Sequence, residues 1–328
     1  MIFSRQVLDI DAAVETDCIV RCLRSQVRKM HRRGAVVGIS GGVDSSVVLA
    51  LCVRAFGPRN VVAVMLPEKD SSPDSERLAR EVAQQFGVTP VREDITRVLD
   101  GFGCYARRDE AIRRVFPEYD PAKGYKAKIV LPPNLLEEGA LNVFSVTIVA
   151  PEGQELSRPL PTNDFLQIVA ASNFKQRTRM ALLYYHAELT HHIVVGTANK
   201  NEHDQGFFVK YGDSGVDIKA LGHLYKTQVY QLARHLGIPE EIQARPPTSD
   251  TYSAPCTQEE FFFRLPFEVM DLLWWAQEHG VPAAEVAEVM GMTQSQIQHA
   301  FDDFIRKQRT TDYLRMQPVG LDQTGVVD

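Results

Sequence analysis

The sequence predicts an α/β fold: a doubly wound parallel sheet followed by a helical C-terminal extension. Three observations support this prediction. Short apolar runs rich in β-branched residues alternate with helical patterns over residues 12–95, an order typical of βαβ units. A turn rich in glycine and serine, residues 38–46, separates the first such run from the helix that follows it. Residues 259–309 carry only helical patterns.

The individual elements are placed by their hydrophobic periods. A helix is expected where apolar residues recur every three or four positions, and a strand buried on both faces where a short apolar run is continuous. In chain order we expect a helix at 12–33, a strand at 35–40, a helix at 44–56, a strand at 60–67, a helix at 74–86 and a strand at 88–95. Further along we expect a long helix at 164–190, a strand at 192–197, a helix at 225–236 and helices within 259–309. These elements divide the chain into a main domain, 1–258, and a helical extension with a tail, 259–328.

Residues 101–162 interrupt this alternation. The stretch is rich in proline and carries no sustained helical or strand period. We expect an insertion with local structure, including a hairpin that turns at Pro151-Glu152-Gly153.

Composition excludes several classes of protein. With 36 basic against 42 acidic side chains, the net charge of −6 disfavours binding of nucleic acid by bulk charge. The five cysteines form no Cys-x-x-Cys pair, which indicates reduced thiols in a cytoplasmic protein. The first residues carry acids and no apolar core, so no signal peptide is expected. No apolar run approaches the roughly 20 residues of a membrane span.

The turn at residues 38–46 has the properties of a phosphate-binding loop. Its glycines allow the backbone to approach an anion closely, and the helix that follows presents a partial positive charge. No Gly-Lys-Ser/Thr follows, so it is not a Walker A loop. Asp44 would repel a phosphate unless a divalent cation lay between them. The simpler alternative is a Gly-Gly turn with a helix cap. In full the loop is Gly38-Ile39-Ser40-Gly41-Gly42-Val43-Asp44-Ser45-Ser46.

This loop resembles that of the ATP pyrophosphatases, a Rossmann-like group of adenine nucleotide alpha-hydrolases. The group includes GMP synthetase, asparagine synthetase and NAD synthetase. The resemblance implies cleavage of ATP between the α and β phosphates, activation of a carboxylate as its adenylate, and attack by a nitrogen nucleophile. Five further segments, in this order, resemble the ammonia-dependent NAD synthetases, which amidate deamido-NAD to NAD and release AMP and pyrophosphate. They are 173–180, 196–202, 206–217, 224–227 and 246–250.

The resemblance assigns roles to residues at matching positions. Asp44 and Glu202 would hold Mg²⁺, and Asp44 and Lys226 would be catalytic, with Lys226 on the ATP phosphates. The rest of the implied ATP site is the loop 38–46 with Thr197 and Thr248, and the implied contacts to deamido-NAD are Arg177, Lys210 and Asp217. Each role has a simpler alternative: Glu202 as a solvated loop acid, the threonines as caps, and Arg177 as the partner of an acid on a neighbouring helix. Phe207 and Phe208 could stack on the pyridine ring or only pack.

Other functions remain as alternatives. Ser214, the long 101–162 stretch and Lys307-Gln308-Arg309 depart from the compact family pattern, so a related amidoligase acting on another carboxylate is the main one. With 37 residues before Gly38, we expect free ammonia or a separate glutaminase as the nitrogen source. The resemblance also implies a homodimer with dinucleotide sites near the subunit interface.

A DNA-binding regulator is the alternative from another class. Residues 282–305 resemble a helix-turn-helix. However, the second helix would carry Asp302 and Asp303 and no basic residue before Arg306, whereas phosphate contacts need lysine or arginine. We therefore expect a helical pair that packs on the rest of the protein.

Overall fold

The five strands of the main sheet are all parallel and follow the order β3-β2-β1-β7-β8. The structure is a computed structural model that describes residues 3–132, 135–136, 144–248 and 251–320. The strands are β1 Ala35–Gly38, β2 Val61–Met65, β3 Val91–Arg92, β7 Ile193–Gly196 and β8 Ile218–Lys219. The predicted doubly wound fold is thus confirmed, although the expected strand at 88–95 is reduced to two residues at the sheet edge.

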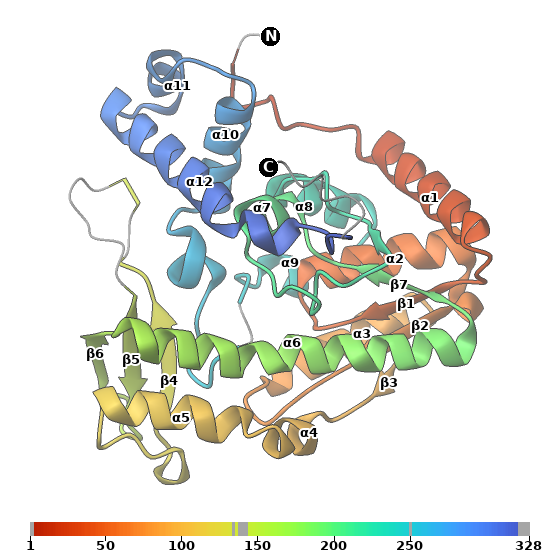
Figure 1. The fold of residues 1–328 in the computed structure, drawn as a ribbon. Coiled ribbons are helices and arrows are strands. Elements are labelled where there is room, and N and C mark those ends of the chain that lie inside the picture. The colour runs from red at the N-terminus through yellow and green to blue at the C-terminus, as the bar shows by residue number, and fades with distance from the viewer. Residues whose placement is uncertain (1–2, 133–134, 137–143, 249–250, 321–328) are drawn as a thin grey trace.

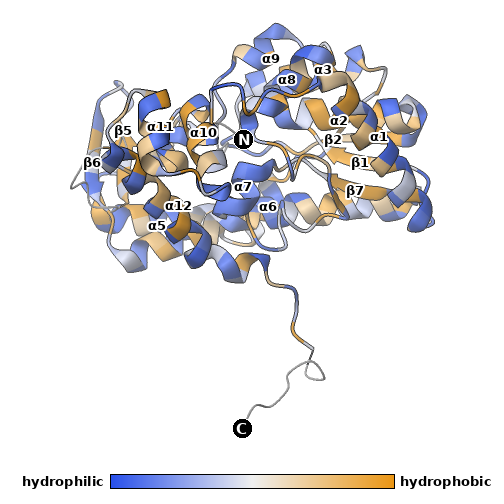
Figure 2. Cartoon of the chain, turned by 90° about the horizontal axis from the view of Figure 1, so that it is seen from above, coloured by the Kyte–Doolittle hydropathy of each residue, from blue (hydrophilic) through white to orange (hydrophobic). Residues whose placement is uncertain are grey.

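Helices cover both faces of this sheet (Figure 1). Side chains alternate along β1: Ala35 and Val37 pack with one set of helices, while Val36 packs with the other. Figure 2 shows β1, β2 and β7 in hydrophobic colours, as strands buried on both faces require. The first set is α1 Ala12–Lys29, α2 Val43–Phe56, α3 Pro73–Gln85, α8 Lys226–His235 and α9 Glu240–Ala244. The second set is α4 Thr96–Gly101, α5 Cys104–Val115 and α6 Thr162–Thr190.

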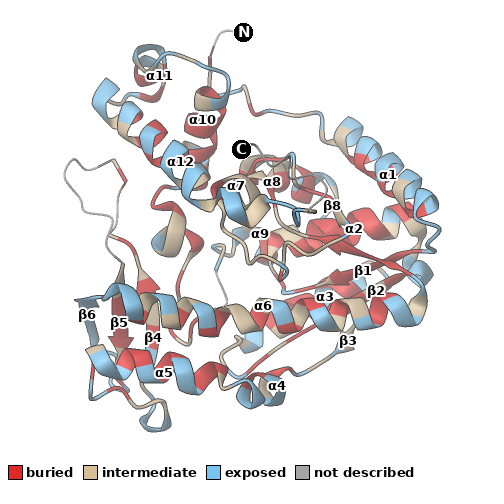
Figure 3. Ribbon diagram, viewed as in Figure 1, coloured by how far each residue is buried: buried red, intermediate tan, exposed pale blue. Residues whose placement is uncertain are grey.

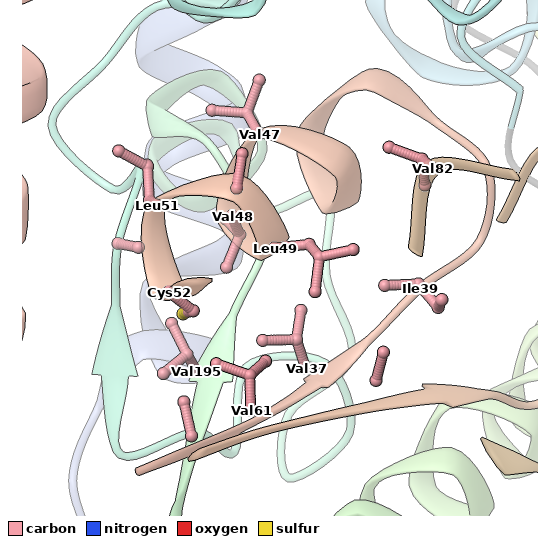
Figure 4. Close-up of a cluster of buried hydrophobic side chains, with 14 of the residues drawn as sticks. Val37, Ile39, Val47, Val48, Leu49, Leu51, Cys52, Val61, Val82 and Val195 are labelled. Carbon is pink, nitrogen blue, oxygen red and sulfur yellow. The ribbon is translucent and has the colours of Figure 1, made fainter. Parts of the chain in front are cut away.

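The core beneath α2 shows how the first face is filled. Val37, Val61 and Val195 come from three neighbouring strands and lie under α2 (Figure 4). Val48 and Leu51 of α2 are fully buried against them. This packing holds the start of α2 close above the ends of β1 and β7. Those two strands adjoin at the point where the strand order reverses, which is where open α/β sheets bind ligands.

The insertion has a small sheet of its own. Strands β4 Lys126–Val130, β5 Ser145–Val149 and β6 Glu155–Pro159 pair antiparallel. The predicted hairpin is confirmed, since β5 and β6 are joined through Pro151 and Gly153. The sheet packs on α5 and on the first part of α6, and β6 is exposed along its length (Figure 3).

Helix α5 was not predicted from the sequence. Its buried face includes Arg108 and Asp109, which pair with each other over 2.9 Å. Paired charges at buried positions break the apolar period on which a sequence-based prediction depends.

The C-terminal extension is helical, as predicted. It consists of a π-helical turn, η3, Glu259–Phe263, and the helices α10 Phe267–Glu278, α11 Ala283–Met290 and α12 Gln294–Arg315. Phe304 of α12 packs edge-on against Trp274 of α10, with ring centroids 5.2 Å apart. One face of the supposed recognition helix therefore lies in a core, which agrees with the expected helical pair and gives no support to DNA binding.

The remaining short elements are α7 Lys200–Gln205 and the 3₁₀ turns η1 Pro58–Asn60 and η2 Pro121–Lys123. None of the helices in the described part of the chain combines the length and the apolar character that a membrane span requires.

Candidate active site

The loop after β1 is a compact turn that begins α2. Gly41 has a φ of +75°, and a Cβ there would lie 2.5 Å from the Ser75 carbonyl oxygen, so a larger residue would not fit. The hydroxyls of Ser45 and Ser46 both donate to the Gly42 carbonyl, over 3.0 and 2.9 Å. These bonds within the chain hold the start of α2 in one shape, and α2 opens with Asp44 in its first turn.

Asp44 and Lys226 form an ion pair across the switch point. Lys226 is the first residue of α8 and is fully buried, and its Nζ donates to Asp44 Oδ2. Burial alone would lower the pKa of Lys226, but the carboxylates of Asp44 and Glu202 outweigh it and raise that pKa. Lys226 is thus a charged ammonium at the N-terminus of α8, a position where a bound anion is favoured.

Asn199 connects Asp44 to Glu202. Its Nδ2 donates to Asp44 Oδ1 over 3.2 Å. Its backbone N–H donates to Glu202 Oε2, and the Glu202 N–H donates to Asn199 Oδ1, both over 3.1 Å. This is a capping box at the start of α7. The other carboxylate oxygen of Glu202, Oε1, accepts a hydrogen bond from Gln258 Nε2 over 3.1 Å.

The carboxylates of Asp44 and Glu202 are suited to a divalent cation. Desolvation and, after it, the charge of Asp44 raise the pKa of Glu202 to about 8, although the Lys226 ammonium acts in the opposite direction. A further cation beside the two acids would therefore stabilise the charged form of Glu202. Mg²⁺ takes one or two protein carboxylates and completes its shell with phosphate oxygens and water. The described residues contain no cluster of three or more metal-ligating side chains, so these two acids fit Mg²⁺ only together with a bound phosphate.

A cavity of about 750 Å³ opens from this pair of acids. Its lining includes most of the residues that the sequence singled out: Gly38, Ile39, Ser40, Gly42, Val43, Asp44, Ser45, Arg177, Thr197, Glu202, Lys210, Lys226 and Thr248. Gly41 and Ser46 do not line it, because Gly41 turns towards Ser75 and the Ser46 hydroxyl is bonded to the Gly42 carbonyl. Gly41 and Ser46 therefore shape the loop, and a direct ATP contact for either of them stays a prediction.

Arg177 and Lys210 lie together on the wall of the cavity. Arg177 Nε donates to the Lys210 carbonyl over 3.2 Å, and Lys210 Nζ donates to the Tyr313 carbonyl over 2.8 Å. Arg177 is exposed and pairs with no acid in the described structure. This arrangement leaves cationic groups beside the cavity, as a phosphate-bearing ligand would need.

Asp217 does not line the cavity. Its Oδ1 accepts from the Tyr184 hydroxyl over 3.1 Å, and its Oδ2 accepts from the Val194 N–H over 2.8 Å. Here the carboxylate stabilises the link between β7 and β8, and a contact of Asp217 to the dinucleotide stays a prediction. Ser214, where a glycine was expected, donates to the Val209 carbonyl over 3.0 Å. Lys307 does not line the cavity; its Nζ lies 2.9 Å from Asp303 Oδ2 and donates to the Phe262 carbonyl over 3.0 Å.

The family model described as NAD synthase matches this chain over residues 15–114 and 147–318. The chain belongs to the NAD synthase family. A relative named NH(3)-dependent NAD(+) synthetase, from Rhizobium meliloti (strain 1021), is 49% identical over 318 residues, which cover 97% of this chain and 94% of the relative. A relative of the same name from Thermotoga neapolitana is 37% identical and covers 78% of this chain and 81% of its own length.

Solved structures of the same fold agree with this membership. An NH3-dependent NAD synthetase from Campylobacter jejuni superposes with a TM-score of 0.61 at 21% identity, and covers 95% of this chain and 100% of that one. A protein described as an NMN synthetase, from Francisella tularensis, gives 0.59 at 19% identity and covers 95% and 99%. At these sequence identities the superpositions show a shared fold only. The two solved structures bear different names, NAD synthetase and NMN synthetase.

Two residues of this candidate site were not predicted from the sequence. Asn199 has a local signal, since Asn followed three positions later by Glu is a capping-box pattern. Gln258 has none, because it reaches Glu202 from 56 positions away. Phe207 and Phe208 both line the cavity. Phe207 packs against Phe262, with centroids 5.1 Å apart, and Phe208 stacks on His203 at 5.7 Å.

Proposed function

We propose that this chain amidates deamido-NAD to NAD with ammonia, at the expense of ATP, which is cleaved to AMP and pyrophosphate. The observation that carries the proposal is a single cavity. The cavity holds the phosphate-type loop, the Asp44–Lys226 pair and Glu202, and it also holds the cationic Arg177–Lys210 wall. An ATP site and an anionic second substrate can therefore meet in one space. The sequence similarity to a relative named for this activity, which extends over nearly the full length of both chains, supports the same function.

The reaction has two steps. An oxygen of the nicotinate carboxylate attacks the α-phosphorus of ATP, the bond to the bridging oxygen breaks, and pyrophosphate leaves. Ammonia then attacks the acyl carbon, AMP leaves with the electron pair of the broken C–O bond, and a proton passes from nitrogen to solvent. No side chain forms a covalent bond to the substrate in either step.

The chain's own groups act mainly by charge and position. Lys226 places a positive charge where negative charge gathers on the leaving phosphates, which is the most effective form of stabilisation in a site shielded from water. The N-terminus of α2, which begins in the loop, offers a partial positive charge to the same phosphates. Asp44 and Glu202 would hold Mg²⁺, which supplies charge neutralisation on the phosphate oxygens when it is bound.

The setting of the enzyme is part of the proposal. We infer a cytoplasmic homodimer that uses free ammonia or ammonia delivered by a separate glutaminase. The cysteines in the described part of the chain are unpaired, which suits a reducing compartment. We also infer that residues 1–258 form the catalytic unit and 259–328 an extension, although Phe3 and Tyr225 pack into the core of the extension.

One assay tests the proposed function. Purified protein is incubated with ATP, Mg²⁺, ammonium and deamido-NAD, and AMP, pyrophosphate and NAD are measured. We expect all three in equal amounts, and no NAD when glutamine replaces ammonium. If ATP binds but deamido-NAD yields no AMP above background, the acid substrate is a different carboxylate. Robust turnover with glutamine alone would show a glutaminase activity that this proposal denies.

A further inference from the structure

Helix α10, in the C-terminal extension, packs against α8. Three of its side chains, Phe267, Asp271 and Glu278, follow one another at intervals of four and seven residues, which places them on one face of the helix. Bonds from this face reach α7 and α8, the helices that carry Glu202 and Lys226.

Asp271 bonds to both helices at residues next to the charged centre. Its Oδ2 accepts from the Thr227 backbone N–H over 2.8 Å, and its Oδ1 accepts from the side-chain amide of Asn201. Thr227 directly follows Lys226, and Asn201 directly precedes Glu202. The first N–H groups of a helix have no partner within it, so Asp271 supplies a bond that the start of α8 lacks. One carboxylate therefore joins the chain neighbours of Glu202 and Lys226.

Glu278 repeats this arrangement two turns further along α10. Its Oε1 lies 2.8 Å from Lys200 Nζ, and its Oε2 accepts from the Tyr225 hydroxyl. Lys200 is the first residue of α7, and Tyr225 directly precedes Lys226. Two acids on one helix thus each connect the start of α7 with the start of α8.

Phe267, at the start of α10, contacts the catalytic lysine itself. The Lys226 Nζ lies 5.5 Å from the centre of the Phe267 ring, within the range of a cation–π interaction. The same Nζ donates to Asp44 Oδ2. Helix α10 therefore borders the ammonium and also bonds to the residues on both sides of it in the chain.

We propose that Asp271 and Glu278 fix the spacing between Glu202 and Lys226 and so prepare the site for Mg·ATP. This inference rests on the ATP half of the proposed function. Neither Asp271 nor Glu278 lines the cavity, so both are positioning residues that act through their neighbours. The extension then contributes to the ATP site through α10.

A fixed spacing matters because the site works by charge. Stabilisation of the leaving phosphates depends on charged groups that are in place before the reaction. Helix α7 has six residues, and a helix this short is not stable on its own hydrogen bonds. Helix α10 has a core of its own, where Trp274 packs edge-on against Phe304 with centroids 5.2 Å apart. Bonds from α10 therefore give α7 and α8 a fixed reference.

The test measures binding of Mg·ATP by calorimetry to wild type, Asp271→Ala and Glu278→Ala. Each substitution removes a carboxylate that joins α7 to α8, so the affinity should fall roughly 3- to 10-fold. In the full reaction kcat should fall to a similar extent, while the KM for deamido-NAD stays within twofold. Asp271→Asn and Glu278→Gln keep one oxygen as acceptor and add an amide donor for the second partner, so they should recover most of the affinity.

Glu285→Ala is the matched control. Glu285 is an acid on α11 of the extension; it accepts from the Phe3 N–H over 3.3 Å and does not line the cavity. Its replacement should leave the affinity for Mg·ATP unchanged. Asp271 is fully buried, whereas the Glu278 side chain is 25% exposed. If Asp271→Ala does not fold, Glu278→Ala decides the matter.

Three results would overturn the inference. Normal affinity for Mg·ATP in a Glu278→Ala variant with a lowered melting temperature would show that the α10 contacts only stabilise the fold. An equal loss of affinity in Glu285→Ala would show that the effect is not specific to α10. A Glu278→Gln variant as weak as Glu278→Ala would show that the hydrogen bonds of Glu278 do not set the affinity.

The same measurements separate this inference from the proposed function. A wild-type protein that binds Mg·ATP but forms no AMP with deamido-NAD contradicts the proposed function alone, because the inference is judged on Mg·ATP binding. A wild-type protein that does not bind Mg·ATP contradicts both.

Discussion

The side-chain amide of Asn199 donates to Asp44 Oδ1 over 3.2 Å, although the two residues are 155 positions apart. Asp44 follows β1 and Asn199 follows β7, the two strands that adjoin at the switch point. Because Asn199 also caps Glu202, one neutral side chain sets the spacing between both acids. We regard Asn199 as a positioning residue for the charged centre of the site.

Replacing Asn199 should therefore uncouple the two acids. Asn199→Ala removes the bond to Asp44 and the cap of α7, and a lost N-cap costs about 0.5–2 kcal/mol of stability. We expect a roughly tenfold fall in kcat/KM for ATP, with a stronger dependence on Mg²⁺ concentration. Steady-state kinetics at several Mg²⁺ concentrations check this.

A matched control separates the cap from the site. Thr293 also caps its helix with a full capping box, at the start of α12 and away from the cavity. Thr293→Ala should lower the melting temperature by a comparable amount and leave the kinetics unchanged. If both variants lose activity equally, Asn199 has no special role in the site.

The sequence predicted the parts of this site that depend on local pattern. The run from Gly38 to Ser46 was identified because glycines, hydroxyls and a helix start are adjacent in the chain, and the structure places seven of these nine residues on the cavity. Asp217 has a local motif too, but its actual partner depends on how β7 pairs with β8. The link from Gln258 to Glu202 and the meeting of Phe144 with Phe261 arise from tertiary packing. No local period encodes such contacts.

Asp44→Asn keeps the shape of the side chain and removes its charge. We expect turnover to fall by a hundredfold or more, about 2.7 kcal/mol of barrier, because the cation and Lys226 both lose their partner. ATP binding measured without metal should change much less. Production of AMP at near-normal rates by this variant would contradict the role of Asp44.

Arg177 and Lys226 should affect different substrates. Arg177 lies on the polar middle of α6 and is exposed, so Arg177→Ala should raise the KM for deamido-NAD roughly ten- to a hundredfold through loss of a charge-assisted contact. The KM for ATP should move little. Lys226→Met should damage ATP use first, and it should also lower the melting temperature, since it leaves Asp44 without its buried partner. Measuring both KM values for both variants decides the matter, and a shared defect in both substrates would contradict separate sites.

The pKa of Asp271 makes the free energy of unfolding depend on pH. Burial raises the pKa of Asp271 to about 6, even though the Thr227 N–H donates to its Oδ2 over 2.8 Å and the Asn201 amide donates to its Oδ1. An unfolded aspartate titrates near 3.9. Between these two values Asp271 binds more protons in the folded protein than in the unfolded chain. Its contribution to the free energy of unfolding therefore falls as the pH rises from about 4 to 6 and stays reduced above that.

Asp271→Asn should remove this penalty. The new amide can also donate to Asn201 Oδ1, which has no hydrogen-bond partner among the described residues, once the Asn201 side chain turns over. Relative to wild type, the variant should gain stability on the order of 2 kcal/mol between pH 4 and pH 7. Chemical denaturation at both pH values measures the difference, and Asp302→Asn, on the exposed side of α12, is the control that should show none. A gap between variant and wild type that is the same at pH 4 and pH 7 would mean that Asp271 does not titrate between them in the folded protein.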